Sequence, residues 1–147
     1  MFKHILVPTD GTPLSEETAR KAVALARETG ASITAFYAKR DTSDIYWDKM
    51  AWVTLPEQSK LDEAAERDAQ KILSFVDELC LAAGVKCTRL TSVCESVYEG
   101  IIDAATVSGC DLIFMASHGR RGIGALLLGS ETHKVLTHSK IPVLVYR

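Results

Sequence analysis

Residues 111–119 read Asp-Leu-Ile-Phe-Met-Ala-Ser-His-Gly, and this stretch decides which fold the rest of the chain is expected to form. Its first part, Asp111–Ala116, is apolar throughout its middle, which is typical of a strand that is buried on both faces of a sheet. The glycine-containing residues 117–124 follow directly and predict a loop. The start of the chain repeats this arrangement, because the apolar run Phe2–Pro8 leads into Thr9-Asp10-Gly11. Two buried strands are therefore expected to carry polar residues at their carboxyl ends.

Helical and strand patterns alternate along the whole chain. Helices are predicted from the Thr12-Pro13 cap to Gly30, over Glu57–Ala83, from a Ser96–Glu99 capping box to Gly109, and from Gly129-Ser130 to His138. Further strands are predicted at Ser32–Ala38, Val85–Val93 and Ile141–Tyr146. This alternation predicts one α/β domain over residues 1–147, with an open, doubly wound, five-stranded parallel sheet and helices on both faces.

The strand order depends on where the two polar loops meet. Ligands of open α/β sheets bind beyond the carboxyl ends of strands, at the point where the strand order reverses. If the loops after Pro8 and Ala116 share one site, their strands are neighbours and the order is 3-2-1-4-5. A flavodoxin-like order would instead place the third strand beside the first. We expect the Rossmann-like order 3-2-1-4-5.

Composition excludes several classes of protein. The chain is 47% hydrophobic and 24% charged with a net charge of −2, which argues against a general nucleic-acid binder. No apolar run is long enough for a membrane span, and residues 1–8 lack the features of a signal peptide, so we expect a cytoplasmic protein without a membrane partner. The four cysteines form no Cys-x-x-Cys pair and are expected to be small apolar side chains.

Residues 118–140 combine glycines with positive charge. Arg120, Arg121, Lys134 and Lys140 are basic, whereas Glu131 is the one acid in this segment. The free N–H groups at the start of the helix after Gly129, together with the helix dipole, attract phosphate, and Ser130 adds a hydroxyl donor. A purely structural alternative stays open, in which the glycines shape a turn and Ser130 caps the helix. The pattern is neither a Walker A nor a Gly-x-Gly-x-x-Gly motif.

Asp10 is the second candidate for a ligand contact. An acid at the end of the first strand can accept hydrogen bonds from a ribose hydroxyl or bind a metal, but it can also cap the turn before Thr12. A phospho-receiver is disfavoured, because the neighbours Thr9 and Gly11 are not acidic. The spacing of His133 and His138 does not stack them on one helical face, and no nucleophile elbow occurs. No catalytic residue and no metal ligand is therefore predicted.

Three segments together resemble the universal stress protein family. They are Lys3–Gly11, Asp111–Arg120, and Leu126–Ser130 with the helix and strand that follow it, and the similarity spans the chain in the family's order. The resemblance implies an adenine nucleotide α-hydrolase-like fold, a cytoplasmic location and a dimer. The family has nucleotide-binding and non-binding branches, and binders carry Gly-x2-Gly-x9-Gly-Ser/Thr. Gly119, Gly129 and Ser130 fit this motif, whereas Ala116 replaces its first glycine.

The resemblance also implies which residues form the nucleotide site. Pro8, Asp10 and Ala38 would surround adenine and ribose, and the phosphates would lie at Gly119, Arg120, Gly129, Ser130 and Thr132. Glu131 would add a negative charge near the phosphates. The site predicted in full comprises Pro8, Thr9, Asp10, Ala38, Ala116, Ser117, Gly119, Arg120, Gly122, Gly129, Ser130, Glu131 and Thr132.

The expected function is therefore that of a stress-response regulator that binds ATP or AMP, with or without Mg2+, and hydrolyses ATP slowly at most. The alternatives are a non-binding family member that acts through protein partners, and an enzyme of the adenine nucleotide α-hydrolase type. The apolar run Ile141–Tyr146 is expected to pair with its copy across a two-fold axis and form a homodimer, because a bare apolar sheet edge is a liability. Trp47 and Trp52 lie in an aperiodic segment and are expected to cover the core or a ligand or partner surface.

Overall fold

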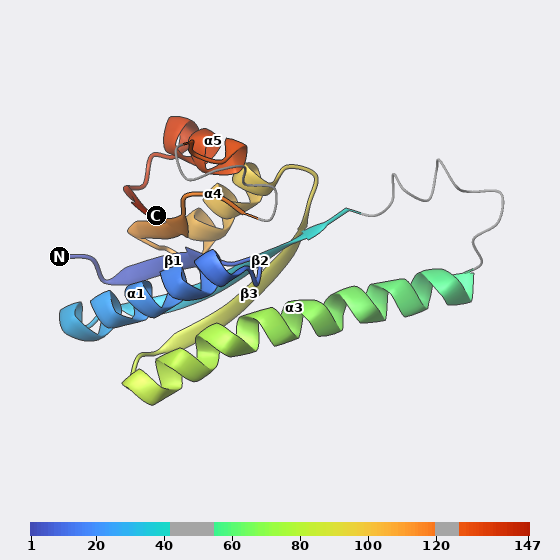
Figure 1. The fold of residues 1–147 in the computed structure, drawn as a ribbon, viewed down its shortest axis with the longest axis horizontal. Coiled ribbons are helices and arrows are strands. Elements are labelled where there is room, and N and C mark those ends of the chain that lie inside the picture. Colours follow the sequence, from blue (N-terminus) through green and yellow to red (C-terminus); the bar gives the residue numbers. More distant parts are fainter. Residues whose placement is uncertain (42–54, 120–126) are drawn as a thin grey trace.

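The computed structural model describes residues 1–41, 55–119 and 127–147. In these residues five strands form one parallel sheet in the order β3-β2-β1-β4-β5, so the predicted fold class and strand order are confirmed. The strands are β1 (His4–Pro8), β2 (Ser32–Arg40), β3 (Cys87–Cys94), β4 (Leu112–Ala116) and β5 (Val143–Tyr146). The helices are α1 (Pro13–Thr29), α3 (Leu55–Ala83), α4 (Val97–Val107) and α5 (Ser130–His138). Figure 1 shows their arrangement.

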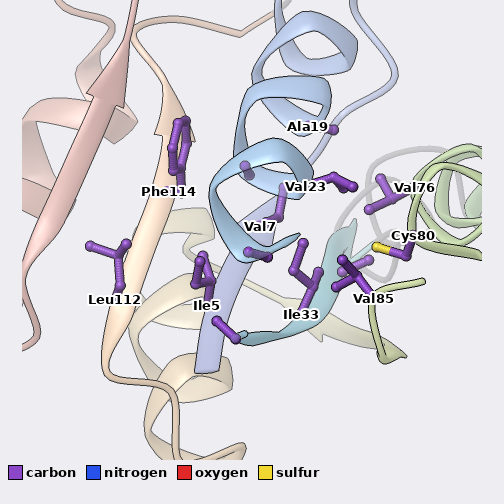
Figure 2. Close-up of a cluster of buried hydrophobic side chains, with 14 of the residues drawn as sticks. Ile5, Val7, Ala19, Val23, Ile33, Val76, Cys80, Val85, Leu112 and Phe114 are labelled. Atoms are coloured by element: carbon purple, nitrogen blue, oxygen red, sulfur yellow. The ribbon is translucent and has the colours of Figure 1, made fainter. Parts of the chain in front are cut away.

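Helices cover both faces of the sheet (Figure 1). On one face, α1 and α3 bury a cluster that includes Ile5, Val7 and Ile33, which Figure 2 shows from close range. On the other face, α4 and α5 pack against a second cluster that contains Leu6 and Ile113. Every residue of β4 is buried, as the apolar stretch at its centre predicts.

The capping box predicted at the start of α4 is not formed. Ser96 takes the N-cap position, but its side chain makes no capping hydrogen bond. Glu99, the expected partner, accepts the hydroxyl of Tyr98 at 3.0 Å. The side chain of Glu131, from the neighbouring helix α5, accepts the backbone N–H of Tyr98 at 2.8 Å. Packing of α5 against α4 therefore supplies the acceptor that the local sequence motif was expected to provide.

The last strand begins later than predicted. β5 starts at Val143 rather than at Ile141, and Pro142 lies outside it. The hydroxyl of Ser139 accepts the N–H of Ile141 at 3.0 Å and donates to the carbonyl oxygen of Ile141 at 2.8 Å. Both backbone groups of Ile141 are thus bound to Ser139, and Pro142, whose carbonyl oxygen accepts the N–H of Ile113 at 2.9 Å, has no N–H of its own for pairing.

A single carboxylate fastens the amino end of β1. Asp111 accepts the backbone N–H groups of Lys3 at 2.9 Å and His4 at 3.0 Å. Burial raises the pKa of the Asp111 carboxyl, but the hydrogen bonds from His4 and Lys3 outweigh it and hold the pKa below its ordinary value. Asp111 is thus a structural acid at the edge of the sheet opposite to the predicted site.

Two of the four cysteines are small buried side chains, as the sequence predicted. Cys80 and Cys110 are buried in the two apolar clusters, and burial raises the pKa of the Cys110 thiol to about 11. Trp47 and Trp52 lie outside the described residues. None of the helices in the described part of the chain has the length and apolar character needed to cross a membrane.

Candidate functional site

The loops that follow β1 and β4 meet at the carboxyl edge of the sheet. A Cβ atom placed on Gly119 would lie 2.7 Å from Oδ2 of Asp10, which is closer than a side chain tolerates. A larger residue would require the Asp10 carboxylate to move, whereas glycine lets the backbone after β4 lie directly against it. The contact brings together two residues more than a hundred positions apart, as the shared site predicted from the sequence requires.

Asp10 is held in place by the turn that leads into α1. Its Oδ1 atom accepts the backbone N–H of Thr12 at 3.0 Å and the Thr12 hydroxyl at 2.6 Å. Thr12 in turn caps α1, because its side chain accepts the N–H of Ser15 at 3.3 Å. The capping role considered for Asp10 is thus real. It occupies Oδ1, whereas Oδ2 is the oxygen that faces Gly119.

Pro8, Thr9 and Ala38 lie at the same edge. Pro8 is the last residue of β1 and pairs with Phe36, so Ala38 extends β2 beyond the end of β1. Thr9 is buried, and its N–H donates to the carbonyl oxygen of Phe36 at 2.9 Å. Thr9 therefore ties the turn that carries Asp10 to β2. Pro8 and Ala38 lie at the ends of the two strands beside this turn.

Ala116, which replaces a motif glycine, fits its place without strain. It is the last residue of β4, and no described residue other than glycine has a positive φ. Its carbonyl oxygen accepts the hydroxyl of the buried Thr132 at 3.0 Å. The next residue, Ser117, is also buried and donates its N–H to the carbonyl oxygen of Tyr146 at 2.8 Å. Thr132 and Ser117 thus fasten the end of β4 to α5 and β5.

The N-terminus of α5 packs directly against the residues that follow β4. The N–H of Gly129 donates to the carbonyl oxygen of Ser117 at 2.8 Å, and a Cβ atom on Gly129 would lie 3.1 Å from Cα of His118. Gly129 is the N-cap residue of α5 and has no side chain with which to cap it, while Ser130 behind it is exposed. Helix N–H groups that no cap occupies, at the positive end of the helix dipole, form an anion-binding site.

Glu131 lies in the first turn of α5, as the sequence predicted, and its carboxylate has partners among the described residues. Its Oε2 atom accepts the N–H of Tyr98 at 2.8 Å, and its Oε1 atom lies 3.5 Å from the ammonium group of Lys134. The carboxylate therefore caps α4 and pairs with a cation instead of standing as an uncompensated charge at the N-terminus of α5. Tyr98 is the contributor that sequence reasoning missed, since only the packing of α4 on α5 brings it to Glu131.

Two of the predicted site residues are not described by the structure, and the described ones offer no metal site. Arg120 and Gly122 lie outside the described residues. Within the described ranges, no group of three or more His, Cys, Asp or Glu side chains is placed to hold a metal ion. The described site thus consists of one carboxylate, a close backbone approach at Gly119, an exposed helix N-terminus, and a hydrogen bond of 3.2 Å between Oγ of Ser117 and Nδ1 of His118.

Comparison with known sequences identifies relatives over the whole length of the chain. The sequence profile of the Universal stress protein family matches residues 1–147. Universal stress protein MJ0531 of Methanocaldococcus jannaschii is 30% identical over 151 residues, which cover 100% of this chain and 83% of the relative. Universal stress protein YxiE of Bacillus subtilis is 30% identical over 149 residues, and the alignment covers 100% of both chains.

Solved structures share the fold. The structure of hypothetical protein MJ0577 superposes with a TM-score of 0.80 at 25% identity, over 99% of this chain and 95% of that one. A universal stress protein in complex with cAMP gives a TM-score of 0.73 at 20% identity, over 99% and 97% of the two chains. The universal stress protein from Archaeoglobus fulgidus in complex with dAMP gives 0.68 at 16% identity, over 99% and 98%.

Proposed function

Because the chain belongs to the universal stress protein family, we propose that it is a nucleotide-binding member, which holds ATP or AMP at the carboxyl ends of β1 and β4. In this proposal the protein acts as a regulator in a stress response and not as a dedicated enzyme. Two structural neighbours are complexes with cAMP and dAMP, which supports an adenine nucleotide as the ligand class.

The observation that carries the proposal is the position of residues 117–119 between two groups of opposite character. On one side Gly119 lies against the carboxylate of Asp10, and on the other His118 lies against Gly129 at the start of α5. A carboxylate accepts hydrogen bonds from the hydroxyls of a ribose, and a helix N-terminus binds phosphate. The two groups thus suit the two ends of a ribose phosphate.

The surroundings of Ala116 and Glu131, the two residues that depart from the binding pattern, are compatible with the proposal. Ala116 has a negative φ, so its methyl group does not distort the backbone at the motif position. Glu131 is bound to Tyr98 and paired with Lys134, so its charge is partly compensated before a phosphate arrives. Both observations are consistent with a binding member, and titration with nucleotide decides between the two branches.

Metal chemistry is not needed in this proposal. Mg2+ that arrives with ATP would be held chiefly by the phosphates, in keeping with its preference for oxygen ligands and retained water. Among the described residues, Asp10 already uses one oxygen for Thr12. We therefore expect AMP to bind without a metal, and any hydrolysis of ATP to be slow.

Calorimetric titration of the purified chain with ATP, ADP and AMP, each with and without Mg2+, tests the proposal. We expect saturable binding of at least one of these nucleotides with one site per chain. If no heat is detected at millimolar nucleotide and none co-purifies, the chain is a member of the non-binding branch that acts through protein partners.

We further propose that the chain forms a homodimer through β5. This strand lies at the edge of the described sheet, and its Leu144 side chain is 38% exposed. Antiparallel pairing of two copies would cover both edges at once. Light scattering should give about twice the chain mass of 16.1 kDa, and Leu144→Lys should reduce it to one chain. A wild-type mass of one chain at micromolar concentration would contradict the dimer.

A further inference from the structure

A groove at the open edge of β3, beside α4, lies outside the proposed nucleotide site. Its volume is about 450 Å3. In Figure 1, β3 leads directly into α4, and in the described sheet it has only β2 as a neighbour. The residues that line the groove come from β3, from α4 and from the turn between them, and are Leu90, Ser92, Val93, Cys94, Glu95, Ser96, Glu99, Gly100, Asp103, Ala104 and Val107.

The backbone of β3 offers hydrogen bonds toward this edge. The N–H of Ile33 in β2 donates to the carbonyl oxygen of Lys86 at 2.8 Å, and the parallel register continues to Cys94. In a parallel pair, alternate residues of one strand turn both N–H and C=O toward the neighbouring strand. Leu90 therefore faces β2, whereas the polar backbone groups of Thr91 and Val93 point outward. This is the arrangement to which an additional strand pairs.

Side chains give the groove an apolar part and an acidic rim. Val93 is 62% exposed and Val107 is 84% exposed, although both are apolar. Glu95, Glu99 and Asp103 are the charged residues of the lining, and none of the described lining residues is basic. Nearby Arg89 does not balance them, because its guanidinium is bound to Asp77 of α3 at 2.6 Å. The groove thus combines apolar surface with charge of one sign.

We propose that the β3–α4 groove binds an extended segment of a partner protein that alternates basic and apolar residues, added to the sheet as a further strand beside β3. The backbone of the segment pairs with Thr91 and Val93. Its lysines or arginines lie on the α4 face of the sheet, toward Glu95, Glu99 and Asp103, and its apolar side chains lie on the opposite face, beside Val93. Strand addition of this kind takes affinity from the main chain and specificity from alternate side chains.

A second copy of this chain is a poorer occupant than a basic partner. Pairing of β3 with its own copy would bring Glu95, Glu99 and Asp103 of the two chains together at one interface. Like charges opposed across an interface or a strand pair are unfavourable, whereas a basic segment is attracted to the rim. Charge complementarity therefore selects a heterologous partner. The proposal does not depend on nucleotide binding, since no predicted nucleotide residue lines the groove.

The test uses the full chain and a synthetic peptide of alternating lysine and valine, labelled for fluorescence anisotropy. We expect saturable binding that weakens as salt is added, and no binding of the matched peptide of alternating glutamate and valine. The double variant Glu99→Lys with Asp103→Lys should weaken binding by about ten-fold or more. Its matched control, Glu28→Lys with Glu78→Lys, changes the net charge equally on exposed residues outside the groove and should bind as the wild type does.

Two further measurements separate strand addition from general charge attraction. N-methylation of either the lysine amides or the valine amides blocks one edge of the peptide, so one of these two peptides should lose binding. The proposal would be overturned if both N-methylated peptides still bound as the unmethylated peptide does. It would also be overturned if both double variants weakened binding equally, or if the peptide did not bind at millimolar concentration. If Glu99→Lys with Asp103→Lys does not fold, Glu99→Gln with Asp103→Asn replaces it. A wild-type dimer that the peptide dissociates would identify a second copy as the occupant and would also overturn the proposal.

Discussion

The N-termini of α1 and α5 lie at the same edge of the sheet but are satisfied in different ways. At α1, Thr12 caps the helix through the N–H of Ser15, and Pro13 in the first turn has no N–H to satisfy. At α5, the N-cap is Gly129, which has no capping side chain, and Ser130 is exposed. The first N–H groups of α1 are capped by a side chain of the same turn, whereas no side chain of α5 caps its first N–H groups.

This difference indicates where an anion binds. A helix N-terminus attracts negative charge through its free N–H groups and its dipole, and a local cap uses those groups. α4 provides a third case, because Glu131 supplies a carboxylate to Tyr98 from outside the helix. Among these three helix starts, α5 is therefore the one whose first N–H groups take no side-chain cap from the described residues, and the following predictions test the contrast with α1.

Gly129→Asp should produce the largest effect. The new carboxylate would cap α5 much as Thr12 caps α1, would repel phosphate, and would bring its Cβ within 3.1 Å of Cα of His118. We expect nucleotide affinity to fall by more than about ten-fold and the melting temperature to drop, as measured by calorimetry and thermal denaturation. Ser130→Ala is the matched variant, since it removes one hydroxyl donor and should weaken binding less. Unchanged affinity in Gly129→Asp would remove α5 from the site.

Asp10→Ala should have the next largest effect. Loss of a hydrogen bond to a charged group costs about 1.5–3 kcal/mol, so we expect nucleotide affinity to fall by roughly 10- to 100-fold. Asp10→Asn keeps an acceptor for Thr12 and separates the turn from the ligand contact. If Asp10→Asn lowers nucleotide affinity as much as Asp10→Ala does, the negative charge is what the ligand requires. If Asp10→Ala keeps the wild-type affinity, Asp10 does not contact the ribose. Circular dichroism checks that each variant is folded.

Thr12→Ala should show the opposite pattern, with an effect on stability and little on binding. Removal of the α1 cap is expected to lower the free energy of unfolding by about 1 kcal/mol, as measured by urea denaturation. Nucleotide affinity should change by less than about two-fold, because the Thr12 N–H still donates to Asp10 at 3.0 Å. Thr12→Ser retains the hydroxyl and should restore most of the stability. If Thr12→Ala impaired binding as strongly as Asp10→Ala, the two helix starts would not be functionally distinct.

Asp111→Asn should have the smallest effect, at the edge of the sheet opposite to the proposed nucleotide site. The hydrogen bonds from His4 and Lys3 outweigh burial and lower the pKa of Asp111 in the folded state. The resulting stability is present above the unfolded pKa of about 4 and is lost as the pH falls through the lower folded pKa. Asp111→Asn should therefore be less stable than the wild type at neutral pH. In urea denaturation from about pH 7 to pH 3, the difference should shrink toward the acid end, while nucleotide affinity at neutral pH stays unchanged.

Much of the fold follows from local sequence patterns. The apolar residues Leu112–Ala116 predict a buried strand, and Thr12-Pro13 predicts the start of α1, because these signals depend only on residues close in sequence. The strand order followed from one functional argument, namely that the loops after β1 and β4 share a site. The contact of Gly119 with Asp10 agrees with that argument.

The tertiary structure alone decided which partner each polar group takes. From sequence, Ser96 and Glu99 were expected to cap α4, yet it is the carboxylate of Glu131 that bonds to the N–H of Tyr98. Capping motifs describe bonds within one helix, whereas this bond depends on the distance between α4 and α5. In the same way, the carbonyl oxygen of Ala116 finds the hydroxyl of Thr132 only because α5 packs beside the end of β4. Local patterns thus predict where backbone segments form, and the packing of those segments selects which side chains meet.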